Sequence, residues 1–336
     1  MHSTDIFMTV DNNFLEYALV VIRWIKFHTS WKVRLYLCVP NTSTKYTYTK
    51  RLEDISNENF YIKIISFTGT EKRTKFFREF EKHNYHLSIA SFFRLFIADF
   101  VPKEVEKIIY LDADLIINTD LHELYNIDIK KTIGGVDGLF GKKWTQKYLS
   151  EIDITITDYI NSWVLLINLK RWRKLNLQRE IIKYAEKNSK YLKLGDQDLI
   201  NIFFQGEIEY IDARWNNIVW FGKALSKDTN CIFHTVWKIK ANSIFYPNYE
   251  IKKLYNFFSE TRTTIWTDLK IIFVYLFWSN ITNTWKMLWN KRILKYEKNS
   301  LKDHILLFTL LLHPGVFYFF ISKFYKKIKK IYSRII

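Results

Sequence analysis

The stretch KIIYLDADLIIN, residues 107–118, decides the fold class of this chain. Four apolar side chains lead into an aspartate, a small residue and a second aspartate, Asp112 and Asp114. In an extended backbone, side chains i and i+2 point to one face, so both carboxylates can converge where the strand ends. Hard divalent cations such as Mn²⁺ and Mg²⁺ prefer oxygen ligands of this kind. The stretch therefore predicts a buried strand with a cation site at its end.

Strand and helix patterns alternate on both sides of this stretch. Apolar runs of strand length lie at 6–10, 33–39, 61–67, 107–111 and 163–169, and helical spacing fits 14–29, 88–100, 172–187 and 196–204. Such alternation predicts an α/β domain in which helices cover a mostly parallel sheet. Ligands of these sheets bind beyond the carboxyl ends of the strands, which directs attention to the residues after each strand.

An Asp-x-Asp triplet alone is a weak signal, and two other interpretations exist for it. One is a solvated turn. The other is a phosphatase of the haloacid dehalogenase type, which also carries Asp-x-Asp after a strand. That family has Thr or Val two residues after the triplet, where this chain has Ile116, and it places the motif early in the chain.

The positive charge of the chain is concentrated near its end. The net charge is +17 over 336 residues. Residues 252–336 contain 16 Lys or Arg against 4 Asp or Glu, together with 19 of the 60 aromatic residues. We therefore divide the chain into an α/β domain at 1–250 and a helical, basic and aromatic region at 251–336. The two cysteines favour a reducing compartment, and because the strand pattern begins by residue 6 we expect no signal peptide.

Several further motifs accompany the acidic pair, in a fixed order along the chain. They are IFMTVDNNF at 6–14, HLSIASFFRL at 86–95, GGVD at 134–137, YINSWVLLINL at 159–169 and LGDQDLIN at 194–201. Together with the acidic triplet and a late histidine, they resemble glycosyltransferase family 8, which includes bacterial lipopolysaccharide galactosyl- and glucosyltransferases and the glycogenins. The resemblance covers residues 5–245. It implies the GT-A type fold of nucleotide-diphospho-sugar transferases, a Rossmann-like mixed sheet flanked by helices.

The resemblance also implies a metal site and a donor site. Asp112, Asp114 and His234 would bind Mn²⁺ or Mg²⁺. The residues that would bind the UDP-sugar donor are Thr9, Asp11, Asn13, Phe14, Arg94, Asp112, Ala113, Asp137, Asn161, Ser162 and Lys240. Within this set Asp11 and Asn13 would contact the base, and Phe14 would stack on it.

Catalysis in the resembled family retains the anomeric configuration of the sugar. Gln197 and Asp196 match the positions nearest the reacting carbon, so they are the candidate catalytic residues. Other interpretations stay open: Asp196 follows Gly195 before an apolar helix and fits a helix N-cap, and Arg94 fits a surface ion pair. His86 precedes a helix and fits a capping or packing role.

Two tryptophans depart from the family pattern. Trp163 stands where the family has the glycine of Asn-Ser/Ala-Gly, and Trp237 replaces the glycine of the late motif. Glycine is used where backbone must approach a ligand closely or adopt positive φ. These changes could crowd the donor, reshape the pocket or signal lost activity.

The C-terminal region has the composition of a membrane interface, with Trp, Tyr and Lys together. Its apolar runs lie at 269–278 and 305–322. Residues 305–322 reach the lower limit for a span, but a proline and the positive-inside rule favour a hairpin or an in-plane helix. A helical domain covering the sheet is the alternative. We expect a cytoplasmic protein, peripheral on the inner face of the membrane and in contact with anionic lipid.

The sequence thus favours a metal-dependent retaining hexosyltransferase. It would move galactose or glucose from a UDP-sugar to a membrane-displayed glycan or glycolipid such as lipopolysaccharide core. A catalytically degenerate scaffold or partner subunit is the alternative. Nucleic-acid binding is a further rival, because basic surfaces attract any phosphate, but the long apolar runs of the tail favour lipid. We expect no nucleic-acid partner.

Overall fold

The computed structural model describes residues 3–67, 89–138, 146–147, 150–152, 155–219, 230–235 and 249–259. All of them belong to one compact unit, which extends to Ile265. The second unit, Trp266–Ile336, lies outside the described residues, as do both apolar runs of the tail. The proposed division of the chain at residue 250 therefore stays a prediction.

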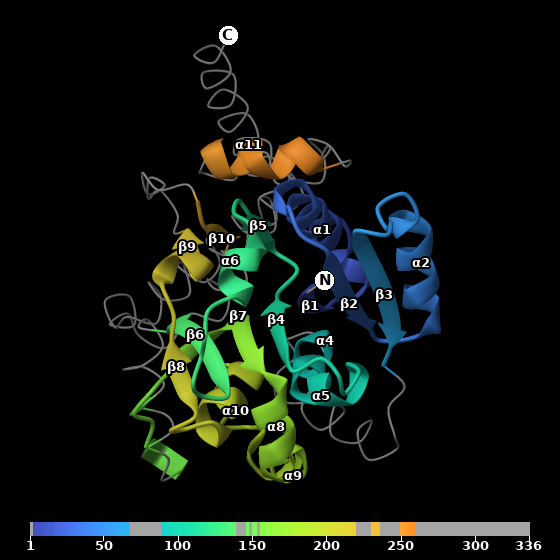
Figure 1. Ribbon diagram of the computed structural model, residues 1–336. Helices are drawn as coiled ribbons and strands as arrows, with labels where there is room; N and C mark the ends of the chain where they lie inside the picture. Colours follow the sequence, from blue (N-terminus) through green and yellow to red (C-terminus); the bar gives the residue numbers. More distant parts are fainter. Residues whose placement is uncertain are drawn as a thin grey trace, which may run out of the picture. The chain divides into compact units, whose positions relative to one another are not determined.

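A seven-stranded mixed sheet forms the centre of the described unit (Figure 1). Its strand order is β3-β2-β1-β4-β7-β6-β8. The strands are β1 (Thr4–Thr9), β2 (Val33–Val39), β3 (Phe60–Ser66), β4 (Lys107–Leu111), β6 (Ile133–Asp137), β7 (Ile160–Asn168) and β8 (Ile208–Tyr210). The first four strands in sequence pair in parallel, and β7 runs antiparallel to both β4 and β6. The start of β7 therefore lies beside the end of β4.

A second, three-stranded sheet continues from the end of β4. It has the order β5-β10-β9 and consists of β5 (Leu115–Ile117), β10 (Ile232–Thr235) and β9 (Asn217–Val219). β10 is antiparallel to β5 and parallel to β9. Three residues separate β4 from β5, so residues 112–114 connect the two sheets.

Helices bury both faces of the large sheet, as alternation along its strands requires. The α-helices are α1 (Leu15–His28), α2 (Thr42–Leu52), α4 (Ile89–Phe92), α5 (Ile97–Phe100), α6 (Leu121–Tyr125), α8 (Leu169–Leu175), α9 (Gln178–Asn188), α10 (Asp196–Phe203) and α11 (Tyr249–Phe258). Ile6 and Met8 of β1 belong to the core shared with α1, α2 and α11. Phe7 between them belongs to the core shared with α8, α9 and α10.

The predicted strands are all present, with ends that shift by up to three residues. The helix expected at 88–100 is instead a chain of short turns, with a 3-10 segment at Phe93–Phe96 between α4 and α5. The helix expected at 172–187 is two helices, α8 and α9. Asn176 ends α8 in the left-handed region, at φ 52°, a conformation that asparagine tolerates better than most residues.

The helix at the start of the predicted C-terminal region, α11, packs on the sheet-containing unit. The Tyr255 ring lies 5.9 Å from that of Tyr17, and Phe258 meets Trp24 edge to face at 4.9 Å. None of the helices within the described ranges is long and apolar enough to cross a bilayer. The segment at 305–322 is outside those ranges, so its membrane role stays a prediction.

Candidate active site

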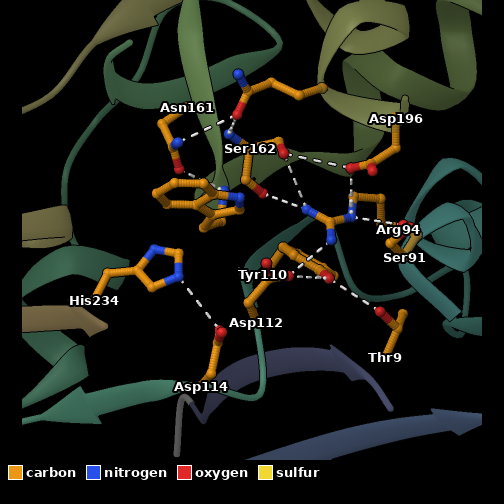
Figure 2. A network of polar contacts seen from close by, with 12 residues as sticks. Thr9, Ser91, Arg94, Tyr110, Asp112, Asp114, Asn161, Ser162, Asp196 and His234 are labelled. Atoms are coloured by element: carbon orange, nitrogen blue, oxygen red, sulfur yellow. Dashed lines mark hydrogen bonds and ion pairs between the residues drawn. The ribbon is translucent and has the colours of Figure 1, made fainter. Parts of the chain in front are cut away.

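The acidic pair lies in the link between the two sheets, and strand pairing brings the predicted histidine to it. β10 pairs with β5 so that His234 is opposite Leu115, the residue that follows Asp114. His234 Nε2 is 3.3 Å from Asp114 Oδ1, and the imidazole is 3% exposed (Figure 2). Two of the three predicted metal ligands, 120 residues apart in the sequence, therefore meet at one point.

Arg94 occupies the centre of the site and joins its two other carboxylates. Its Nη2 donates to Asp112 Oδ1 at 2.7 Å, and its Nε is 3.1 Å from Asp196 Oδ2 (Figure 2). Nη1 donates to the carbonyl oxygen of Ser162 at 2.6 Å and to its Oγ at 3.2 Å. The side chain is 3% exposed, so the structure places it in a buried network, unlike the surface ion pair considered above.

Tyr110 is a site residue that the motif analysis missed. It is fully buried, and its hydroxyl donates to Asp112 Oδ1 at 2.6 Å and lies 3.0 Å from Thr9 Oγ1. The Arg94 guanidinium stacks over its ring at 4.2 Å. Because Tyr110 and Asp112 are two residues apart in extended backbone, the same period-two rule that paired Asp112 with Asp114 identifies Tyr110.

A buried amide network connects β7 with the start of α10. Gln197 Oε1 accepts from Asn161 Nδ2 and from the Ser162 backbone N–H, each at 3.2 Å. Gln197 Nε2 donates to Tyr159 Oη at 2.8 Å, and that hydroxyl donates to Asp198. Both ends of the Gln197 amide are therefore held, which fixes its orientation beside Asp196.

Asn216 extends this network and was also missed. Its Nδ2 donates to Asn161 Oδ1 at 2.7 Å, and its side chain is buried. No motif or predicted strand lay near Asn216 in the sequence, whereas Tyr159 is the first residue of the motif at 159–169.

The backbone before α10 requires a glycine. Gly195 takes φ 59° and ψ −115° and occupies the N-cap position, so Asp196 is the first helical residue and not the N-cap. Replacing Gly195 with alanine is expected to lower the unfolding free energy by roughly 1–3 kcal/mol, because a Cβ is strained in this region. Chemical denaturation measures the loss.

A matched control is Gly206→Ala, beyond the other end of α10. Gly206 also has positive φ, 80°, and the space that an alanine Cβ would occupy there is open. Both variants lose stability, and only Gly195→Ala displaces Asp196 and Gln197. Equal activity of the two variants would contradict the link between this turn and the site.

Burial dominates the ionisation of the carboxylates. Desolvation raises the pKa of Asp196 to about 6, although the charge of Arg94 acts in the opposite direction. Desolvation also raises the pKa of Asp112, again against Arg94. Burial disfavours the charged guanidinium, but the charges of Asp112 and Asp196 outweigh it and raise the pKa of Arg94.

The raised pKa of Asp196 predicts a pH-dependent stability. The folded state holds this proton more tightly than the unfolded state, whose carboxyl titrates near 3.9. The stabilisation is therefore complete below about pH 4 and is lost as pH rises to about 6. In metal-free protein we expect a decline of about 2–3 kcal/mol over this window.

Asp196→Asn removes this titration and should flatten the profile. Urea denaturation between pH 4 and 7 measures it in both proteins. As pH rises, the unfolding free energy of the wild type should fall and that of the variant should stay level, so the variant becomes relatively more stable. Parallel profiles would contradict the assignment of the titration to Asp196.

The loop after β1 forms a separate part of the predicted site. Asp11 Oδ1 accepts from the backbone N–H groups of Asn13 and Phe14, at 2.9 and 3.2 Å, and so caps the short 3-10 turn Asn12–Phe14. Asn13 is exposed, and the Phe14 ring packs 5.7 Å from Tyr17. The base-binding roles of these residues stay predictions.

The remaining predicted residues divide by location. Ala113 is buried between the two aspartates, and Asp137 ends β6. Lys240, His86 and Trp237 are outside the described residues. Their predicted roles are untested.

The donor atoms of the cluster fit a divalent cation. Arg94 pairs with Asp112 and Asp196, and Asp114 contacts His234. The mixed oxygen and imidazole donor set of Asp112, Asp114 and His234 suits Mn²⁺. Within the described ranges, however, no three acidic, His or Cys side chains converge on one point. Arg94 and Tyr110 both donate to Asp112 Oδ1.

The fold is of the GT-A type, the fold of the glycosyltransferase LgtC. An active-site mutant of LgtC superposes with a TM-score of 0.62 at 20% identity, covering 79% of this chain and 99% of that one. The galactosyltransferase LgtC with donor and acceptor sugar analogues gives 0.60 at 19% identity, with the same coverage. GlyE of Streptococcus pneumoniae TIGR4 gives 0.57 at 18% identity, covering 76% of this chain and 61% of GlyE.

Sequence comparison narrows the class to one family. Residues 5–238 match the model of glycosyl transferase family 8, and the chain belongs to this family. A provisionally assigned glycosyltransferase of Haemophilus influenzae is 32% identical over 141 residues, 42% of each chain. GlyF of Streptococcus pneumoniae is 28% identical over 135 residues, 40% of this chain and 31% of GlyF. The chain thus matches less than half the length of these relatives.

Proposed function

We propose that the protein is a retaining hexosyltransferase that uses a UDP-sugar, galactose or glucose, and Mn²⁺ or Mg²⁺. Its acceptor would be a membrane-displayed glycan such as lipopolysaccharide core. The observation that carries the proposal is the contact of Asp114 with His234, next to Asp112, in a family 8 chain. The LgtC complex with donor and acceptor sugar analogues supports a two-sugar site.

The residues present would divide the work between the two ends of the donor. Asp112, Asp114 and His234 would hold the metal, which supplies a positive charge for the diphosphate leaving group. Asp196 is ionised above about pH 6 and would stabilise positive charge at the anomeric carbon. Gln197, fixed at both ends of its amide, would orient the sugar.

Arg94 would act on the substrate through the carboxylates. Its guanidinium pairs with Asp112 and Asp196 and donates to the carbonyl oxygens of Ser162 and Ser91, so it positions these groups while remaining buried. This differs from the direct donor contact that the resemblance implies. Preorganisation of this kind lowers the reorganisation that the site requires during reaction.

The direct test is release of UDP from a panel of UDP-sugars, with Mn²⁺ or with EDTA. Metal-dependent turnover of UDP-galactose or UDP-glucose, raised by membrane glycolipid extract, is the expected result. Tight UDP binding without turnover on any donor would favour the degenerate scaffold. Absence of metal-dependent UDP binding would refute the proposed site.

The membrane part of the proposal has a separate test. The excess of 12 positive charges in residues 252–336 supports attraction to anionic lipid. Full-length protein should float with vesicles that contain phosphatidylglycerol and stay behind with phosphatidylcholine alone. Retention on DNA without lipid binding would favour the nucleic-acid alternative.

A further inference from the structure

Trp163 is anomalous in its strand. All nine residues of β7 are described, and among the first eight of them Trp163 alone is not buried. Its neighbours Ser162 and Val164 have at most 1% exposure. A large aromatic side chain left partly exposed gives up part of its burial free energy, which a ligand that covers it would recover.

The backbone of Trp163 is fixed relative to the acidic pair. Its carbonyl accepts from the Asp112 N–H at 2.9 Å, and its N–H donates to Asn161 Oδ1 at 3.0 Å. The antiparallel register of β4 and β7 sets Leu111 opposite Val164. Trp163 is thereby held at the point where the acidic pair begins.

The ring of Trp163 is positioned by the histidine of the site. The two ring centroids are 3.8 Å apart at an interplanar angle of 81°. His234 in turn reaches Asp114. The indole therefore forms a rigid wall next to the polar groups of the candidate site.

Such a combination suits a carbohydrate. A pyranose ring has hydroxyl groups around its edge and a patch of C–H groups on its face, so it needs hydrogen-bonding partners and an apolar flat surface together. Asn161, Asp196 and Gln197 provide the first requirement. Within the described residues of the site, Trp163 provides the second.

We propose that Trp163 determines sugar specificity, with its indole packed against the C–H face of a pyranose ring. The inference rests on the proposed function. The sugar can come from the donor or from the acceptor, and the two sources predict different kinetics. In either case, a nucleotide without a sugar makes no contact with the indole of Trp163.

The test compares Trp163→Phe and Trp163→Ala with the wild type. Calorimetry with Mn²⁺ measures binding of UDP, UDP-galactose and UDP-glucose, and hydrolysis and transfer to methyl galactosides and glucosides are measured in parallel. The matched control is Trp31→Ala. Trp31 also contacts a histidine ring, stacking on His122 at 4.1 Å, but it is 51% exposed and lies outside the site.

Either of two results supports the proposal. If the donor sugar packs on Trp163, Trp163→Ala weakens UDP-sugar binding roughly tenfold and leaves UDP binding unchanged. If the acceptor packs there, the KM for the methyl glycoside rises roughly tenfold and the affinity for the UDP-sugar changes much less. Trp163→Phe keeps a ring and loses less in both cases.

Two other results overturn it. Equal loss of UDP and UDP-sugar binding would mean that Trp163 only supports His234. Values indistinguishable from Trp31→Ala would mean that the ring touches no sugar. If the wild-type protein binds no UDP, the proposed function itself is refuted. The two results above, in contrast, refute only the role of Trp163.

Discussion

Replacing Arg94 with methionine is expected to lower the unfolding free energy by about 3–5 kcal/mol, because it leaves buried carboxylates without their partner. Asp112 and Asp196 both depend on this guanidinium. Sugar transfer should fall with it, since the two carboxylates lose their fixed positions. Chemical denaturation and UDP release measure the two effects. Arg94→Lys keeps the charge but lacks the planar guanidinium, so it should retain only part of the stability and part of the sugar transfer.

Arg214 offers a matched control for Arg94. Its guanidinium also stacks on an aromatic ring, that of Trp215 at 4.2 Å, and pairs with a carboxylate, Glu123 at 2.9 Å. The difference is exposure, 32% for the Arg214 side chain against 3% for Arg94. Arg214→Met should therefore cost less than about 1 kcal/mol. Similar losses in the two variants would show that burial does not set the strength of the Arg94 network.

Replacing Asp114 with asparagine should reduce metal-dependent turnover by about 10²–10⁴-fold, because a metal contributes several kcal/mol to the stabilisation of developing charge. Asn keeps the size of the side chain and removes the charge that faces His234. Mn²⁺ affinity, measured by the loss of free Mn²⁺ signal in electron paramagnetic resonance, should fall in parallel. That readout does not depend on activity.

The control for Asp114 is Asp128→Asn. Asp128 is also a paired carboxylate, with Lys130 as its partner, but its side chain is 78% exposed. Its replacement should leave Mn²⁺ affinity and turnover at wild-type levels. Unchanged Mn²⁺ affinity in Asp114→Asn would exclude this carboxylate from the metal site, whatever happened to turnover.

Local pattern was sufficient to predict the strand framework. The apolar run before Asp112 and the alternation of strands and helices depend on neighbours within a few residues, so β1, β2, β3, β4 and β7 could be placed to within three residues. Helix breaks were harder. The end of α8 at Asn176 depends on a left-handed residue, and no apolar period reveals such a residue in advance.

The sequence predicted which residues belong to the candidate site better than it predicted which of them touch. The motifs named Asp112, Asp114 and His234, and the fold brings the last two within 3.3 Å. Arg94 was expected at the donor; in the structure it bonds Asp112, Ser162 and Ser91, and its contact with the donor stays a prediction. The two-residue period of a strand predicts that Tyr110 lies on the same side as Asp112. Its role in the site could not be predicted, because a tyrosine in an ordinary core has the same pattern.

The sequence by itself determined the family, the strand framework and the residue types that gather at one end of the sheet, because each of these is written in short segments of chain. Only the tertiary structure decided which of those residues touch. The pairing of β10 with β5 carries His234 to Asp114, and the register of β7 on β4 carries Trp163 to Asp112. Contacts across such separations depend on strand register and on burial, which raises the pKa of Asp196 and commits Arg94 to its carboxylates.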